Sequence, residues 1–130
     1  MRKVYTEETY KEKIHQLWEE VFWAASHPTR LHILTVLYGF HSESLPQNSI
    51  YFTDLRDKLG LENSEMVYHL KLLQKAGLVE NVYPAGERNT NRSSVYEITP
   101  KGIEILESLR IPEMLQHALQ EKTSNDETLD

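Results

Sequence analysis

The sequence predicts a mainly α-helical domain with a small antiparallel β-sheet, and three neighbouring segments carry this prediction. The first begins at Asn63 and places small or apolar residues at the helical spacings four, three and four, at Met66, Leu70, Leu73 and Gly77. The second consists of two β-prone runs, 78–83 and 94–99, on either side of the polar stretch PAGERNTNRS. The third is a Thr-Pro pair that suits the start of another helix. This order is that of a helix followed by a β-wing.

The segment before Asn63 supplies a matching shorter helix. In YFTDLRDKLGL, residues 51–61, we expect Thr53 to cap that helix and Gly60 to allow a tight turn into the next one. The β-prone run at 50–52 is expected to form an edge strand that pairs with the wing. Together these elements predict a winged helix-turn-helix with flanking N- and C-terminal helices.

Further helices are expected on both sides of this core. Residues 7–25 show helical periodicity, and the sequence Ser-His-Pro at 26–28 should interrupt that helix. A largely apolar, buried helix should follow and end at Gly39. On the C-terminal side, the helix that starts at Pro100 should break at 111–112, where the sequence is Ile-Pro.

Composition excludes several classes of protein. The chain has 130 residues and no cysteine, so disulfides and thiolate metal sites are ruled out. No apolar run is long enough to span a membrane and the first residues lack a signal-peptide core, so we expect a cytoplasmic protein without a membrane partner. The net charge of −6 argues against a simple nucleic-acid binder. Most of this charge lies outside 26–100, where seven Lys and Arg face eight Asp and Glu.

Four sequence blocks in this order resemble a known family. SHPTRLHILTVL, FTDLRDKLGL, YHLKLLQKAGLVE and YEITPKG look like the successive blocks of the ArsR-like winged helix-turn-helix transcription regulators, particularly the archaeal-type members. The resemblance covers roughly residues 24–106. It implies a sequence-specific DNA-binding regulator of transcription that acts as a homodimer on double-stranded DNA.

The helix that begins at Asn63 is the candidate recognition helix. A helix that enters the major groove needs polar side chains on the face opposite its apolar side, and here that face carries Ser64, Glu65, Tyr68, Lys71 and Lys75. His69 contacts either the groove or the neighbouring helix. From the preceding helix, Thr53 and Arg56 are expected to touch the DNA backbone. The alternative is an ordinary solvated helix face.

The wing tip is the second candidate DNA contact. Two arginines bracket a polar stretch there and suit phosphates or a narrow minor groove, with candidate residues Arg88, Asn89, Asn91 and Arg92. A solvated hairpin tip would also be polar. Arg30 is as well suited to an internal salt bridge as to a phosphate contact.

A homodimer interface is expected on the terminal helices, because two-fold symmetry matches palindromic half-sites. The N-terminal helix carries more large apolar side chains than one helix face needs. The candidate interface residues are Ile14, Trp18, Phe22 and Trp23, together with Leu109, Met114 and Leu115 of the C-terminal helices. Alternatively, the aromatic residues complete the core of the monomer.

We therefore expect one winged helix-turn-helix domain over 1–122. It comprises a dimerisation helix (1–25), a DNA-binding core (26–99) and C-terminal helices (100–122), and a disordered tail (123–130) follows. No cofactor, metal site or catalytic motif is expected, so the protein should not be an enzyme. A refinement of this function is a regulator that responds to an unidentified small-molecule effector, bound between the wing domain and the terminal helices. A winged-helix protein–protein interaction module without DNA binding is the alternative function.

Overall fold

The computed structural model describes residues 4–42, 49–83 and 94–128. The N-terminal arm is a nearly continuous helix made of α1 (Glu7–Leu17), the π-helical turn η1 (Trp18–Phe22) and α2 (Trp23–Ser26). The body contains α3 (Pro28–Ser42), α4 (Phe52–Leu59), α5 (Asn63–Lys75) and three short strands, β1 (Ile50–Tyr51), β2 (Val79–Tyr83) and β3 (Val95–Ile98). The C-terminal part consists of α6 (Pro100–Ser108) and α7 (Ile111–Thr128). The predicted fold class, a mainly helical winged helix-turn-helix, is confirmed.

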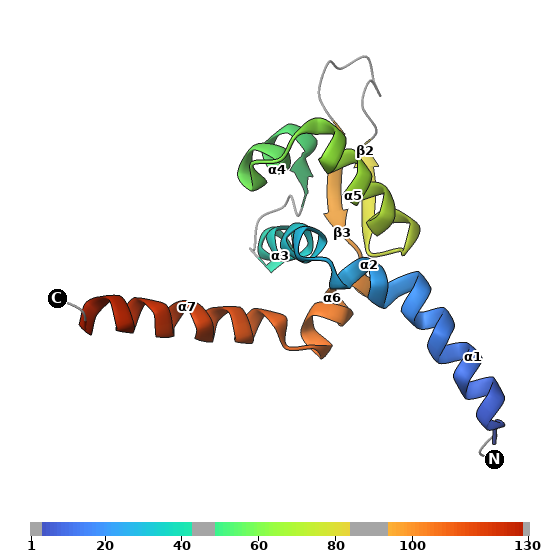
Figure 1. Ribbon diagram of the computed structural model, residues 1–130. Helices are drawn as coiled ribbons and strands as arrows, with labels where there is room; N and C mark the ends of the chain where they lie inside the picture. Colours follow the sequence, from blue (N-terminus) through green and yellow to red (C-terminus); the bar gives the residue numbers. More distant parts are fainter. Residues whose placement is uncertain (1–3, 43–48, 84–93, 129–130) are drawn as a thin grey trace.

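The sheet has the strand order β1-β3-β2 and is antiparallel throughout. Ile50 of β1 pairs with Tyr96 of β3, and Val79 of β2 pairs with Ile98 of β3. The edge strand that was predicted to pair with the wing is therefore present. β2 and β3 form the base of the wing, next to α5 (Figure 1).

The hydrophobic core lies between the helices of the body and the sheet. Ile33, Leu34 and Leu37 of α3 are completely buried, as predicted for that helix. They belong to the same core cluster as Leu55 of α4 and Leu106 of α6. Burying such side chains is the main driving force for folding, so this cluster fixes α4 and α5 on α3 and the sheet.

The terminal helices extend away from this body. Figure 1 shows α1 and α7 projecting in different directions, each with only its inner end near the core. α1 contains no buried residue. In the described part of the chain, no helix has the length and apolar character needed to cross a membrane.

Two predicted boundaries in the N-terminal half are wrong. Thr53 does not cap α4, because the helix already begins at Phe52 and its N-cap is Tyr51, which keeps extended geometry at the end of β1. Gly39 does not end α3, which continues to Ser42. Tyr38 and Phe40, on either side of that glycine, pack against the core and favour the longer helix. By contrast, Gly60 ends α4 as predicted, with φ +66°.

The C-terminal half shows one confirmed and two shifted boundaries. The Thr99 side chain accepts a hydrogen bond from the Gly102 amide, so it caps α6 as the Thr-Pro pair predicted. The break comes before Pro112, at Arg110 with φ +56°, because proline is tolerated in the first turn of α7. α7 continues through 123–128, where the sequence predicts a disordered tail. Extending an existing helix fixes one residue per added hydrogen bond and avoids a new nucleus.

Candidate nucleic-acid interface

α5 presents two chemically different faces. Met66, Leu70 and Leu73 are buried on the core side, at 0%, 1% and 0% exposure. The opposite side carries exposed residues at every position that the sequence assigned to it, namely Ser64, Glu65, Tyr68, Lys71 and Lys75. The predicted rotation of this helix about its axis is therefore confirmed, and its polar side is open to a partner.

This exposed face of α5 combines several kinds of hydrogen-bonding group. Tyr68, with 56% of its surface exposed, provides a hydroxyl group and an aromatic ring. Lys71 and Lys75 provide cations, and Glu65 provides an acceptor. Such a set suits base edges near the start of the helix and phosphates near its end.

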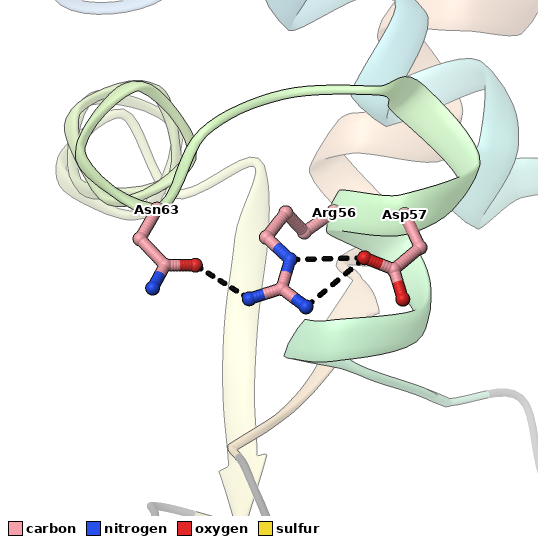
Figure 2. Close-up of polar contacts among 3 residues, drawn as sticks. All are labelled: Arg56, Asp57 and Asn63. Carbon is pink, nitrogen blue, oxygen red and sulfur yellow. Dashed lines mark hydrogen bonds and ion pairs between the residues drawn. The ribbon is translucent and has the colours of Figure 1, made fainter.

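Arg56 fixes the turn that leads from α4 into α5. Its Nη1 donates to Oδ1 of Asn63, the first residue of α5, at 2.7 Å (Figure 2). Its Nε and Nη2 each lie 3.0 Å from Oδ1 of Asp57. Several donors of this half-buried guanidinium are therefore committed to the protein. Contacts of Arg56 and of half-buried Thr53 with a DNA backbone stay predictions.

His69 and Arg30 lie inside the protein. His69 is 7% exposed, so its side chain is not part of the exposed face of α5. Of the two positions expected for it, the DNA groove or the neighbouring helix, the structure shows the second. Arg30 is 3% exposed and makes no ion pair with a carboxylate among the described residues. Both roles expected for Arg30 are therefore wrong. The sequence did hold a signal for this burial, because Arg30 lies in a largely apolar helix.

Arg88, Asn89, Asn91 and Arg92 lie outside the described residues, so their role as wing contacts stays a prediction. Within the described ranges, no three His, Cys, Asp or Glu side chains form a group that could hold a metal ion.

The terminal helices expose apolar side chains that the core does not use. Trp18 is 51% exposed, and the other candidate interface residues are exposed by 40% to 66%: Ile14, Phe22, Trp23, Leu109, Met114 and Leu115. Trp18, Phe22 and Trp23 are not part of the hydrophobic core cluster, which disfavours the alternative that these aromatic residues complete the core of the monomer. Leu17 and Leu119 are exposed in the same way and were missed, although both follow the helical spacing.

A cavity of about 410 Å³ separates the N-terminal arm from α5. Its lining is partly apolar and partly charged, with Trp23 and Ala24 on one side and Leu72, Lys75 and Ala76 on the other. Lys101 completes it and donates a hydrogen bond to the Ala76 carbonyl at 3.1 Å.

Comparison with known proteins identifies the class of this fold. Residues 25–82 match a family described as a helix-turn-helix domain. The transcriptional repressor BigR from Xylella fastidiosa is 19% identical with a TM-score of 0.56, and the match covers 81% of this chain and 93% of BigR. MepR from S. aureus, in a complex with DNA, is 16% identical with a TM-score of 0.54, over 95% of this chain and 97% of MepR.

A third structure matches almost the whole chain. NadR in complex with 4-hydroxyphenylacetate is 16% identical with a TM-score of 0.59, over 99% of this chain and 88% of NadR. No curated relative matches the chain in sequence. The chain thus has the winged helix-turn-helix fold that is found in transcriptional regulators.

Proposed function

We propose that this protein is a sequence-specific DNA-binding regulator of transcription that acts as a homodimer. The observation that carries the proposal is the exposed polar face of α5, opposite a completely buried apolar side. A complex of MepR with DNA exists for a protein of this fold, which supports the proposal. The finer assignment to the ArsR-like, archaeal-type regulators rests on the four sequence blocks that resemble them.

In this proposal α5 enters the major groove, which is wide enough to admit an α-helix. Ser64, Glu65 and Tyr68 contact base edges near the start of the helix, and Lys71 and Lys75 contact phosphates. Segment 84–93 contacts the adjacent backbone or minor groove. His69 takes no part in base contacts, because its ring is buried.

The proposed dimer forms through the exposed apolar residues of the N-terminal arm and α7. Exposed tryptophan and phenylalanine side chains are unfavourable in water, so a second copy of the chain would gain by covering them. Residues 1–25 then serve dimerisation and 26–99 serve DNA binding, while 100–122 add to the interface. Two α5 helices related by a two-fold axis would meet half-sites about one helical turn apart.

Two features support other interpretations. The net charge of −6 and the exposed Glu65 favour the runner-up, a winged-helix module that binds another protein. The cavity between Trp23 and Lys75 supports the refinement with a small-molecule effector, and NadR holds 4-hydroxyphenylacetate in a structure of the same fold.

Selection of duplexes from a random pool at moderate salt tests the proposal. We expect one family of palindromic sequences to be enriched, because the dimer presents the same α5 face twice. Lys71→Gln should weaken binding to the selected duplex, whereas the matched variant Lys13→Gln, which removes the same charge from exposed α1, should not. If no sequence is enriched, or if Lys71→Gln binds the selected duplex as tightly as Lys13→Gln, the interaction-module interpretation replaces the proposal.

A further inference from the structure

A buried arginine links the N-terminal arm to α5. Nε of Arg30 donates to the carbonyl of Ala24 at 2.6 Å, and Nη2 lies 3.5 Å from the carbonyl of Trp23, both in the short helix α2. The guanidinium also lies 4.7 Å from the centre of the Trp23 ring. Because Trp23 belongs to the exposed apolar surface of the arm, Arg30 reaches directly from that surface into the body.

The other end of the guanidinium contacts the recognition helix. Nη1 of Arg30 lies 3.1 Å from Nδ1 of His69 on α5. An arginine can only donate hydrogen bonds, so Nδ1 must be the acceptor and the proton of neutral His69 must be on Nε2. Arg30 thus connects the carbonyls of α2 to one defined tautomer of a histidine in α5.

The ring of His27 completes the cluster. It lies 4.9 Å from the His69 ring, measured between centres. Nδ1 of His27 accepts a hydrogen bond from the Thr29 amide at 3.1 Å, next to the start of α3. Both histidines therefore use Nδ1 as an acceptor, and a proton on either Nδ1 would remove one of these contacts.

The surroundings of His69 disfavour its charged form. Burial lowers the pKa of His69 first, and the positive charge of Arg30 and the nearby His27 lower it further, while Glu65 on the same helix opposes them. Tyr68 packs edge-on against His69, with ring centres 5.2 Å apart. Within the described part of the chain, the titratable groups that face His69 are thus Arg30 of α3, His27 before it, and Glu65 and Tyr68 of α5 itself.

His69 also lies directly behind the face proposed to contact DNA. Tyr68 and Glu65, which that face exposes, are its neighbours on the helix. A rotation of α5 about Arg30 would therefore displace both side chains relative to the bases. Misplacement of a contact by a small distance is enough to lose a directional hydrogen bond.

We propose that Arg30 is a positioning residue for the recognition helix: through neutral His69 it holds α5 at a fixed angle to the N-terminal arm, and protonation of His69 releases α5. The inference rests on the proposed function, because it assigns Arg30 and His69 to the precision of DNA binding. Because Arg30 also contacts Trp23, a movement of Trp23 at the proposed dimer surface would be passed on to α5.

DNA binding at two pH values tests the functional half of this proposal. Affinity for the selected duplex should fall severalfold between about pH 8 and about pH 5, because the lowered pKa of His69 means that its ring gains a proton only toward the acidic end of this range. His69→Asn places an amide oxygen where Nδ1 was and cannot be protonated, so its affinity should change much less. A parallel His27→Asn variant keeps a good capping residue and shows whether the pH dependence of the affinity needs His27. Equal pH dependence in wild type and His69→Asn would overturn the proposal.

The arginine itself is tested by Arg30→Lys. Lysine keeps the charge but lacks the fork that reaches both α2 and His69. Its affinity for the selected duplex should be lower than that of wild type at both pH values, with unchanged affinity for a scrambled duplex. Circular dichroism checks that the variant is folded. If folded Arg30→Lys prefers the selected sequence as strongly as wild type, Arg30 does not position α5.

Nuclear magnetic resonance gives a readout that does not depend on DNA. The ¹⁵N shifts of His69 should show the Nε2-protonated tautomer at neutral pH, and the amide shifts of α5 should follow its titration in wild type but not in His69→Asn. The Nδ1-protonated tautomer, or an α5 that ignores the titration, would contradict the proposal. If these signals appear as expected but no duplex is bound specifically, the proposed function fails while the link between Arg30 and α5 stands.

Discussion

Replacement of Tyr68 by alanine probes the face of α5 most sharply. Tyr68 is 56% exposed, one helical turn from both Ser64 and Lys71, and lies opposite the buried Leu70 and Leu73 side. Its hydroxyl can donate to a base acceptor and its ring can pack on a thymine methyl. One good base contact contributes about 1–3 kcal/mol of discrimination. Affinity for the selected duplex should therefore fall by about five- to 150-fold.

Stability should change little in the same variant. Substitutions on the surface usually alter the free energy of unfolding by no more than about 0.5 kcal/mol. Tyr68 packs edge-on against the His69 ring and still leaves more than half of its surface in solvent. Binding to a scrambled duplex should also be unchanged, because that affinity comes mainly from phosphate contacts.

Fluorescence anisotropy on both duplexes, with a thermal melt followed by circular dichroism, measures these quantities together. Tyr68→Phe is the matched control, because it removes the hydroxyl and keeps the ring. A loss of stability without a loss of specificity would show that the side chain supports the core and that the face has been assigned wrongly. If neither property changes, α5 does not use Tyr68 on DNA and the protein-interaction alternative gains.

Three further predictions concern assembly and stability. Joint replacement of Trp18 and Phe22 by alanine should convert a dimer into a folded monomer, because both side chains are outside the core. Sedimentation should show half the mass of the wild type. A wild-type protein that is a monomer at micromolar concentration would refute the interface. Gly102→Ala should lower the free energy of unfolding by about 1–3 kcal/mol in a denaturant titration, since a Cβ there would lie 2.5 Å from the Leu78 carbonyl oxygen. Unchanged stability would mean that α6 shifts freely. Because the pKa of His69 is lowered in the folded chain, unfolding should become easier as the pH falls below about 6.5, the ordinary histidine value, whereas His69→Asn should show a flatter profile.

The apolar pattern of the sequence was sufficient to predict the helix that carries the site. The spacing of Met66, Leu70 and Leu73 determined which side of α5 is buried, because a helix of fixed period leaves only one solution. Local end signals were less reliable. Gly39 and Thr53 look like a helix terminator and a cap, but packing of Phe40 and the strand geometry of Tyr51 moved both boundaries.

The contacts of Arg30 and His69 could not be predicted in the same way. These residues are 39 positions apart, and their pairing depends on how α3 crosses α5. The exposed aromatic residues show a related limit. A sequence pattern marks Trp18 and Phe22 as one face of a helix, but only the structure shows that both side chains of η1 lie outside the core.

The central claim is that two copies of α5 enter the major groove of one duplex. Methylation interference on the selected duplex tests it directly, because guanine N7 lies in the major groove. We expect interference in two clusters about one helical turn apart on the same side of the duplex, as a two-fold dimer requires. Specific binding that is insensitive to N7 methylation of guanines in the selected half-sites, or a single cluster, would contradict the account.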